Sequence, residues 1–382
     1  MANFVTDKRE RLTIECAPAE LTNQFPSIRG LVRYDGRVIF RGLPHPQVYE
    51  VNPPPGLVMD ECLLYTAYEG ALVNVFWAED KWWFCTNKKL CFDRASWCAA
   101  PGSFKRAFTS CLRKLWQDDS SWGDPFDKSY LQRFGDLNLD KETGYVFMAY
   151  EPEESIACAS KIQNLRLLAT YCKRTDTHNY NCRLVLTCGT EIETPAPLGF
   201  RSVIQLDAAL AEQDPSKCAG IIIVDSRGVH YKILPERYAS ILAARGEQPR
   251  LLNRLYQLME MDQEGERHIE TLCAYYPHAK VAYQRMSDFR ERIVQCYLAT
   301  IDEDWEPQVW MSRYMVNAVM QCLPGTERIV IDRIIAGMTT GQRKKFYKNH
   351  SCLAGGCNAW IGADAPMKQE PTLQDILDFP DE

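Results

Sequence analysis

The residues best suited to chemistry lie in one stretch of the chain, residues 63–97. Glu69 and Gly70 stand just before an apolar run, and Lys88 and Lys89 follow a second apolar run. Glycine lets a ligand approach the backbone closely, and lysine offers a positive charge to phosphate oxygens. The stretch therefore predicts a strand–turn–strand unit that faces a nucleotide or another phosphate compound.

The order of these residues resembles the first motifs of covalent nucleotidyltransferases, and of RNA ligases in particular. In those enzymes a lysine in a Lys-x-Asp/Glu-Gly motif attacks the α-phosphate of the nucleotide. Residues 67–70 (Ala-Tyr-Glu-Gly) stand at this motif, and residues 86–89 (Thr-Asn-Lys-Lys) stand at the later Ser/Thr-x-Lys/Arg element. The run 29–44 resembles the hairpin that precedes them. Over residues 29–97 the resemblance implies an RNA ligase-like core.

The same resemblance implies where the site lies. Ala67 would face a pocket lined by Glu69, Lys88 and Lys232, with the lysines in contact with phosphate. Alanine carries no nucleophile, so a covalent lysyl-nucleotide cannot form at Ala67. The motif position of the two lysines at 88 and 89 indicates phosphate contact rather than attack.

Three later positions of the motif series are also empty. A ligase-like core would carry a glutamate near residues 147–148 (Phe-Met) and another just before Gly220, where Ala219 stands. Of the final Lys-x-Lys element only Lys232 is present, and the missing carboxylates weaken metal binding. We therefore expect a pseudoenzyme: a non-catalytic regulatory protein that binds nucleic acid or a nucleotide, with no catalytic residue, no metal ligand and no cofactor. The candidate nucleotide or phosphate contacts are Glu69, Gly70, Lys88, Lys89 and Lys232.

Two alternatives remain open at this point. The first is an active RNA ligase-like nucleotidyltransferase that has relocated its nucleophile to Lys88, Lys89 or Lys232 and uses ATP or GTP with Mg²⁺. The second is a transcription-linked interaction protein that acts through its acidic tail. That tail carries apolar anchors between acidic residues over 373–379, a pattern suited to folding on a partner.

A second resemblance covers at least residues 1–262. The runs 103–108, 145–148, 233–236 and 245–255 are similar to the infected-cell protein forty-six family of iridovirus immediate-early proteins. This resemblance implies a viral protein made early in infection that acts inside the host cell, in cytoplasm or nucleus. Host or viral regulatory proteins are then expected partners, besides RNA or another single-stranded nucleic acid. It implies no known reaction.

Several elements must position these residues. Hairpins are expected over residues 31–40, 70–86 and 219–234, where runs of β-forming residues flank turn residues, and a helix is expected from Ser103. Helical spacing dominates after Pro235. We expect an α+β protein: a β-rich, mostly antiparallel core over 1–240, an α-helical domain over 241–348 and a flexible acidic tail over 349–382.

Bulk composition narrows the function classes. The 382 residues carry a formal charge of -6, so contact with nucleic acid depends on local basic patches rather than on a global field. The sequence has neither a run of about 18 apolar residues nor a signal-peptide core, so no membrane association is expected. The 16 cysteines are scattered singly, which favours free thiols in a reducing intracellular compartment.

Other candidate sites have simpler explanations. His350, Cys352 and Cys357 supply three of the four ligands that a zinc site usually needs, and coincidence explains them better. The basic run 343–350 is more typical of a solvated helix face than of a nuclear signal. Trp82, Trp83 and Trp97 could stack on bases, but aromatic residues on a pair of strands are more often core residues.

Overall fold

The computed structural model describes residues 3–50, 53–95, 103–116, 128–151, 163–246, 251–259, 261, 263–298, 318, 321 and 326–336. Trp97, the basic run 343–350, the His350–Cys357 cluster and the acidic tail lie outside these residues. By its internal contacts the chain divides into two compact units, Met1–Arg250 and Leu251–Glu382. Each unit is described by itself.

A five-stranded antiparallel sheet forms the centre of the first unit. Its strand order is β11 (Thr177–Asn179), β10 (Asn164–Cys172), β9 (Thr143–Tyr150), β7 (Ala71–Ala78) and β8 (Lys81–Cys85). Strands β7 and β8 confirm the hairpin expected over 70–86. Its turn places Glu79 and Asp80 at φ of 52° and 54°, the left-handed conformation that suits a two-residue hairpin turn.

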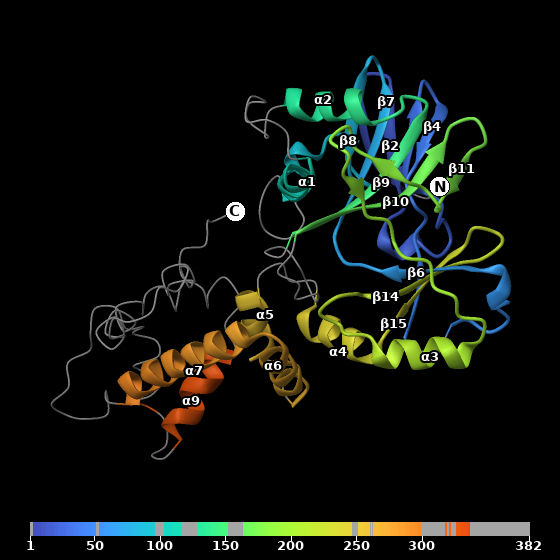
Figure 1. Ribbon diagram of the computed structural model, residues 1–382. Coiled ribbons are helices and arrows are strands. Elements are labelled where there is room, and N and C mark those ends of the chain that lie inside the picture. Colours follow the sequence, from blue (N-terminus) through green and yellow to red (C-terminus); the bar gives the residue numbers. More distant parts are fainter. Residues whose placement is uncertain are drawn as a thin grey trace. The chain divides into compact units, whose positions relative to one another are not determined.

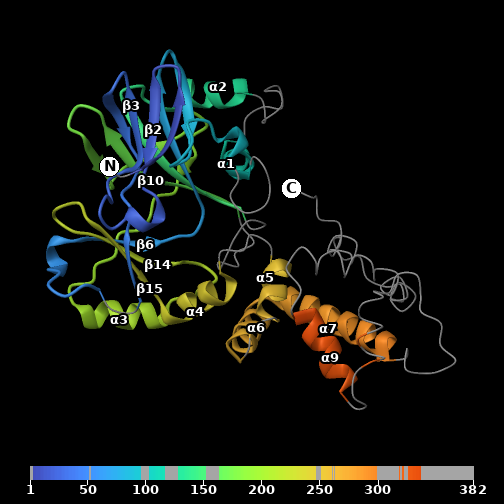
Figure 2. The ribbon, with the colours of Figure 1, turned by 180° about the vertical axis from the view of Figure 1, so that it is seen from behind.

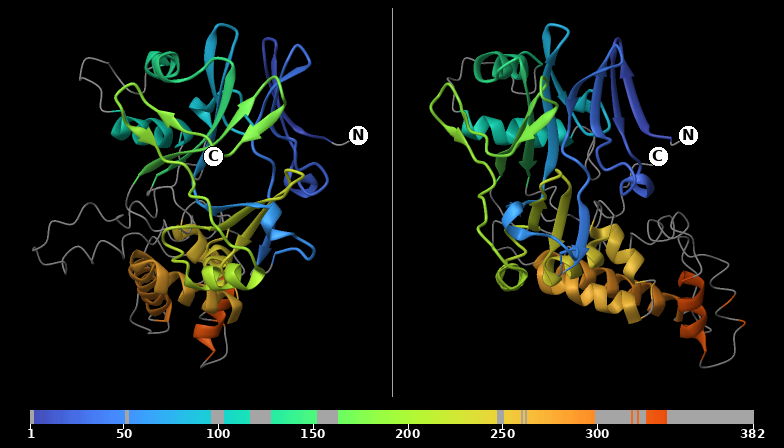
Figure 3. Two further views of the ribbon diagram at one scale, coloured as in Figure 1. Left: turned by 45° about the vertical axis from the view of Figure 1, so that its right-hand side comes forward. Right: turned by 90° about the vertical axis from the view of Figure 1, so that its right-hand side faces the viewer.

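The two faces of this sheet are covered by different elements. Helices α1 (Ser103–Leu115) and α2 (Lys128–Asn138) lie on one face, where Phe108, Leu112 and Phe134 pack against Val73 and Phe147. The four-stranded sheet of the N-terminal segment lies on the opposite face (Figure 3). Buried cores on both faces explain why β7 and β9 are apolar almost without interruption.

That N-terminal sheet consists of β1 (Val5–Arg9), β2 (Leu12–Cys16), β3 (Arg29–Tyr34) and β4 (Arg37–Arg41), in that order and all antiparallel (Figure 2). Strand β2 buries every second residue, so Leu12 and Ile14 reach the core. The β3–β4 turn, Asp35-Gly36, confirms the hairpin expected over 31–40. A short 3-10 helix, η1 (Ala19–Leu21), follows β2.

A third sheet, with four strands, has its own helical cover. Its order is β5 (Gln47–Glu50), β15 (His230–Leu234), β14 (Gly220–Val224) and β6 (Leu63–Ala67); β5 and β15 are parallel, the other pairs antiparallel. Helix α3 (Val203–Glu212) buries Leu206 and Leu210 against this sheet, and the Ser202 hydroxyl caps it by accepting from the Gln205 amide. Helix α4 (Glu236–Arg245) follows β15 directly (Figure 1).

Shorter elements complete the first unit, and helices make up the described part of the second. The short elements are η2 (Met59–Glu61), η3 (Phe92–Arg94), β12 (Leu184–Val185) and β13 (Glu191–Ile192), and the helices are α5 (Leu251–Leu258), α6 (Gln263–Tyr275), α7 (Pro277–Leu298) and α9 (Glu327–Ala336). Arg328 of α9 donates to both carboxylate oxygens of Glu291 in α7, at 3.0 and 2.7 Å. The expected α+β class is confirmed.

Two general features of the described residues bear on the class of protein: the state of their cysteines and the character of their helices. Ten of their cysteines are free, and three of these, Cys16, Cys85 and Cys111, are buried. This is the behaviour of small apolar side chains. Across the same residues, no helix has the combination of length and apolarity that crossing a membrane demands.

Candidate functional site

Strand alternation determines which residues of the third sheet face its helices and which face away. On β15, Tyr231 and Ile233 join the core beneath the sheet, so His230 and Lys232 project from the other face. On β6 the same alternation sends Leu64 into the core and Ala67 to the opposite face. These outward residues form one wall of a cavity.

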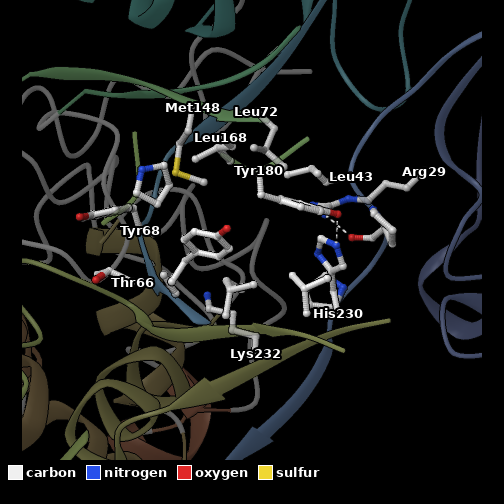
Figure 4. Close-up of a pocket in the computed structure, with 17 residues that line it drawn as sticks. Arg29, Leu43, Thr66, Tyr68, Leu72, Met148, Leu168, Tyr180, His230 and Lys232 are labelled. Carbon is white, nitrogen blue, oxygen red and sulfur yellow. Dashed lines mark hydrogen bonds between the residues drawn. The ribbon is translucent and has the colours of Figure 1, made fainter. Parts of the chain in front are cut away.

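The cavity has a volume of about 160 Å³ and lies between the third sheet and the five-stranded sheet. Leu72, Met148 and Leu168, from β7, β9 and β10, form the facing wall (Figure 4). Its remaining lining residues are mostly apolar or aromatic, and they include Tyr65, Tyr68, Tyr180 and Ile222. We call it the apolar cavity. The volume and the lining of this cavity suit a small, largely apolar group.

Ala67 lies in the wall of this cavity at the end of β6. Its carbonyl oxygen accepts a hydrogen bond from the Ala219 amide at 2.7 Å, and Gly220 is its partner across the β6–β14 ladder. Only 2% of the Ala67 residue is exposed. The position that the motif order assigns to a nucleophile therefore carries a buried methyl group.

Lys232 lines the same cavity, and Glu69 does not. The Lys232 ammonium lies 5.6 Å from the centre of the Tyr238 ring of α4. Glu69 is buried, and its Oε2 accepts a hydrogen bond from the Tyr238 hydroxyl at 3.2 Å. Glu69 therefore ties the β6–β7 turn to α4, and the same tyrosine contacts the lysine of the cavity.

Gly70, Lys88 and Lys89 lie together in the wall of a second cavity, which shares Arg29 and Leu72 with the first. Among the candidates from the sequence, Lys232 lines the first cavity, Gly70, Lys88 and Lys89 line the second, and Glu69 lines neither. The single pocket that we expected around Ala67, lined by Glu69, Lys88 and Lys232, is therefore not formed. Packing also gives a reason for the glycine. A β-carbon on Gly70 would lie 2.7 Å from the Ala149 carbonyl oxygen of β9.

The pair Tyr180 and His230 was not among the candidates from the sequence. The Tyr180 hydroxyl and His230 Nε2 share a hydrogen bond of 2.6 Å at the edge of the apolar cavity (Figure 4). Burial lowers the pKa of His230 to about 3, and the nearby His178 and Arg29 add to the shift. The pair is therefore a neutral polar contact at neutral pH. The spacing His230-x-Lys232 places the histidine on the same strand face as the lysine, but no local signal in the sequence links Tyr180 to it.

This neutral histidine makes stability depend on pH. The pKa of His230 is about 3 in the folded protein and 6.5 in an unperturbed chain. Between these values the unfolded state binds a proton that the folded state does not, so stability falls as the pH drops. We expect a loss of up to about 1.4 kcal/mol per pH unit from this group.

Urea unfolding of the wild type and of His230→Gln, between pH 4.5 and 7.5, measures this contribution. Glutamine does not titrate and can still accept from the Tyr180 hydroxyl, so the difference in slope isolates His230. Parallel pH profiles for the two proteins would contradict the buried neutral state.

The two tryptophans of β8, Trp82 and Trp83, are core residues. Trp82 is 2% exposed and donates from Nε1 to Asp136 at 3.0 Å. Trp83 is 8% exposed and donates to the Ala78 carbonyl at 3.1 Å. Neither indole lines the two cavities, so neither serves them as a stacking platform.

Fold and site together define an α+β protein with a cavity between two sheets, in which an alanine and a lysine share the wall. No protein-family model matches the chain. It is 58% identical over 382 residues to the immediate-early protein ICP-46 of frog virus 3 (isolate Goorha), which covers 100% of this chain and 97% of that protein. The chain belongs to the ICP-46 family of iridovirus immediate-early proteins.

Solved structures with a similar course of the chain are ligases. A putative ATP-dependent DNA ligase from Aquifex aeolicus matches 78% of this chain and 77% of its own, with 12% identity and a TM-score of 0.39. An archaeal ATP-dependent RNA ligase matches 78% and 76%, with 11% identity and a TM-score of 0.38.

Proposed function

We propose that this protein binds nucleic acid or a nucleotide without forming a covalent bond to it, as a regulatory protein inside the infected host cell. The observation that carries the proposal is the wall of the apolar cavity. Ala67 presents a methyl group there, while Lys232 supplies a positive charge in the same wall. A site of this kind holds a phosphate-bearing ligand and cannot capture it through residue 67.

The surroundings of Ala67 support the same proposal. Nucleotidyl transfer needs carboxylates to hold Mg²⁺ near the phosphates. Met148 of β9 lines the cavity where a ligase-like core would carry a glutamate, and Ala219 stands beside Ala67 where a second would be. The side chains that are present in the cavity wall are suited to binding a ligand and orienting it.

One experiment separates binding from covalent transfer. The protein is incubated with α-labelled ATP or GTP and Mg²⁺, then divided between a native filter assay and denaturing electrophoresis. We expect label retained on the native filter and no labelled band after denaturation. Lys232→Met should weaken retention at least about tenfold, because one charge-assisted phosphate contact is lost.

Lys217→Met is the matched control, since that lysine is exposed and lies outside both cavities. It should bind like the wild type. Absence of native retention at low salt, where phosphate contacts are strongest, would refute the proposal.

The alternative of an active enzyme now has one specific candidate. Lys232 shares the cavity with Ala67, whereas Lys88 and Lys89 line the neighbouring one. A labelled band that survives denaturation and disappears in Lys232→Met would establish a relocated nucleophile, with ATP or GTP and Mg²⁺ as its cofactors. The second alternative, action through the acidic tail, concerns residues outside those that the structure describes. If the protein recovers the same partners after deletion of residues 366–382, this alternative is refuted.

A further inference from the structure

The second cavity has the larger volume, about 700 Å³, and its wall is strongly basic. Arg9 comes from β1, Arg29 from β3, and Lys88 and Lys89 from the turn after β8. We call it the basic cavity. Three segments that are distant in the sequence thus bring four positive side chains to one recess.

One acidic side chain lines this cavity, and it is already engaged. Asp7 Oδ2 accepts a hydrogen bond from the Leu90 amide at 2.9 Å, which fixes β1 to the turn after β8. Within the described chain none of the four cations forms an ion pair. The charge of the cavity is therefore available to an anionic ligand.

Two groups at this recess have a lowered pKa, and burial is the main cause for both. Burial lowers the pKa of the Arg29 guanidinium, whose Nη1 donates to the Pro44 carbonyl at 3.1 Å. Burial also lowers the pKa of His45 to about 4, and the charges of Arg29 and Lys88 contribute to that shift. Four cations that share a recess with a single carboxylate attract an anionic ligand.

The turn that carries the two lysines is ordered before any ligand arrives. The Thr86 hydroxyl accepts from the amides of Lys88 at 3.2 Å and Lys89 at 3.0 Å, and the Thr86 amide donates to the Lys89 carbonyl at 2.9 Å. The Cys85 thiol donates to the Leu90 carbonyl. A preorganised turn loses less entropy when its side chains bind a ligand.

We propose that the basic cavity binds the phosphodiester backbone of a single-stranded nucleic acid, one base of which enters the apolar cavity. This inference rests on the proposed function and names its ligand. The two cavities share Arg29 and Leu72, so a strand can pass from one to the other past the arginine. The phosphates then meet Arg9, Lys88 and Lys89.

Single-stranded rather than duplex nucleic acid follows from the pairing of the two recesses. Binding of single strands combines cations along the backbone with aromatic side chains beside the bases. Phe104 lines the basic cavity, and Tyr65 and Tyr68 line the apolar cavity. A base inside a duplex is stacked and paired, and it reaches such a cavity only after it has been extruded from the stack.

Fluorescence anisotropy with short labelled oligouridine and oligothymidine, across a salt series, tests the inference. We expect the triple variant Arg9→Gln/Lys88→Gln/Lys89→Gln to reduce the slope of log affinity against log salt by about 2, since each lost phosphate contact removes about 0.7. The three side chains are exposed, so the variant should fold like the wild type.

The matched control removes the same charge elsewhere on the surface. Lys8 stands beside Arg9 on β1 but outside the basic cavity, and Arg37 and Lys217 are exposed as well. The control Lys8→Gln/Arg37→Gln/Lys217→Gln should keep the wild-type slope. Equal slopes for the two triple variants, or a duplex that binds as tightly as the single strands, would overturn the inference.

Equilibrium dialysis with AMP distinguishes failure of this inference from failure of the proposed function. AMP tests the apolar cavity, so the Arg9/Lys88/Lys89 variant should still bind it. If AMP binds but the Arg9/Lys88/Lys89 variant keeps the wild-type salt slope for single strands, the inference is overturned and the proposed function stays intact. Strand binding that depends on the basic cavity, without AMP binding, would support the backbone site and exclude base capture by the apolar cavity.

Discussion

Replacing Gly220 by alanine is expected to cost about 3–5 kcal/mol of the free energy of unfolding. Gly220 begins β14 at a φ of +114°, which side-chain-bearing residues rarely adopt. A β-carbon there would lie 2.0 Å from the Ile233 carbonyl oxygen of β15. The backbone strain and the clash act together, because the β14–β15 ladder cannot widen without losing its hydrogen bonds.

Gly228→Ala separates the two causes. Gly228 lies in the turn between the same strands at a φ of +77°, and a β-carbon there would meet nothing within 4 Å. That variant should lose about 1–2 kcal/mol, from the left-handed backbone alone. Chemical denaturation of both variants measures the difference, and equal losses would show that contact with Ile233 is not what limits Gly220.

The second large effect is expected from Phe108→Ala, at about 3–5 kcal/mol. Phe108 of α1 is fully buried, and its ring centre lies 5.6 Å from that of Phe147 in β9 and 5.7 Å from that of Phe84 in β8. Truncation leaves a cavity where the helix packs on the five-stranded sheet. Both the free energy and the midpoint of unfolding should fall in a denaturant titration.

Ile204→Ala is the control for this comparison. Ile204 of α3 is 81% exposed, so its truncation should change the free energy of unfolding by less than about 0.5 kcal/mol. A loss at Phe108 no larger than that at Ile204 would mean that α1 is not anchored through this ring.

Local signals in the sequence were enough to predict the hairpins. The turn residues Asp35-Gly36 and Glu79-Asp80 adopt the left-handed conformation that a two-residue hairpin turn needs. The β14–β15 hairpin also forms where it was expected. The pairing of β6 with β14 has no such signal, because its two strands lie far apart in the chain. It depends on tertiary packing, which periodicity does not report.

The same limit applies to the site. Motif order identified Ala67, Gly70 and the lysines, but it gave no reason to place Lys88 and Lys232 in different recesses. Arg9 belongs to β1, which joins the site through the register of the N-terminal sheet and the hydrogen bond from the Leu90 amide to Asp7. The place of a residue such as Arg9 in the site arises from the packing of sheets, which produces no motif of fixed spacing in the sequence.

The parallel pairing of β5 with β15 has a consequence for biosynthesis. Residues 47–50 leave the ribosome early, but their partner strand is complete only when Leu234 has been made. Strand β6 likewise awaits β14. Closing loops of this length is entropically costly and slow, so the sheet that carries Ala67 and Lys232 forms late. A nascent chain shorter than about 234 residues therefore lacks the wall that carries Ala67 and Lys232.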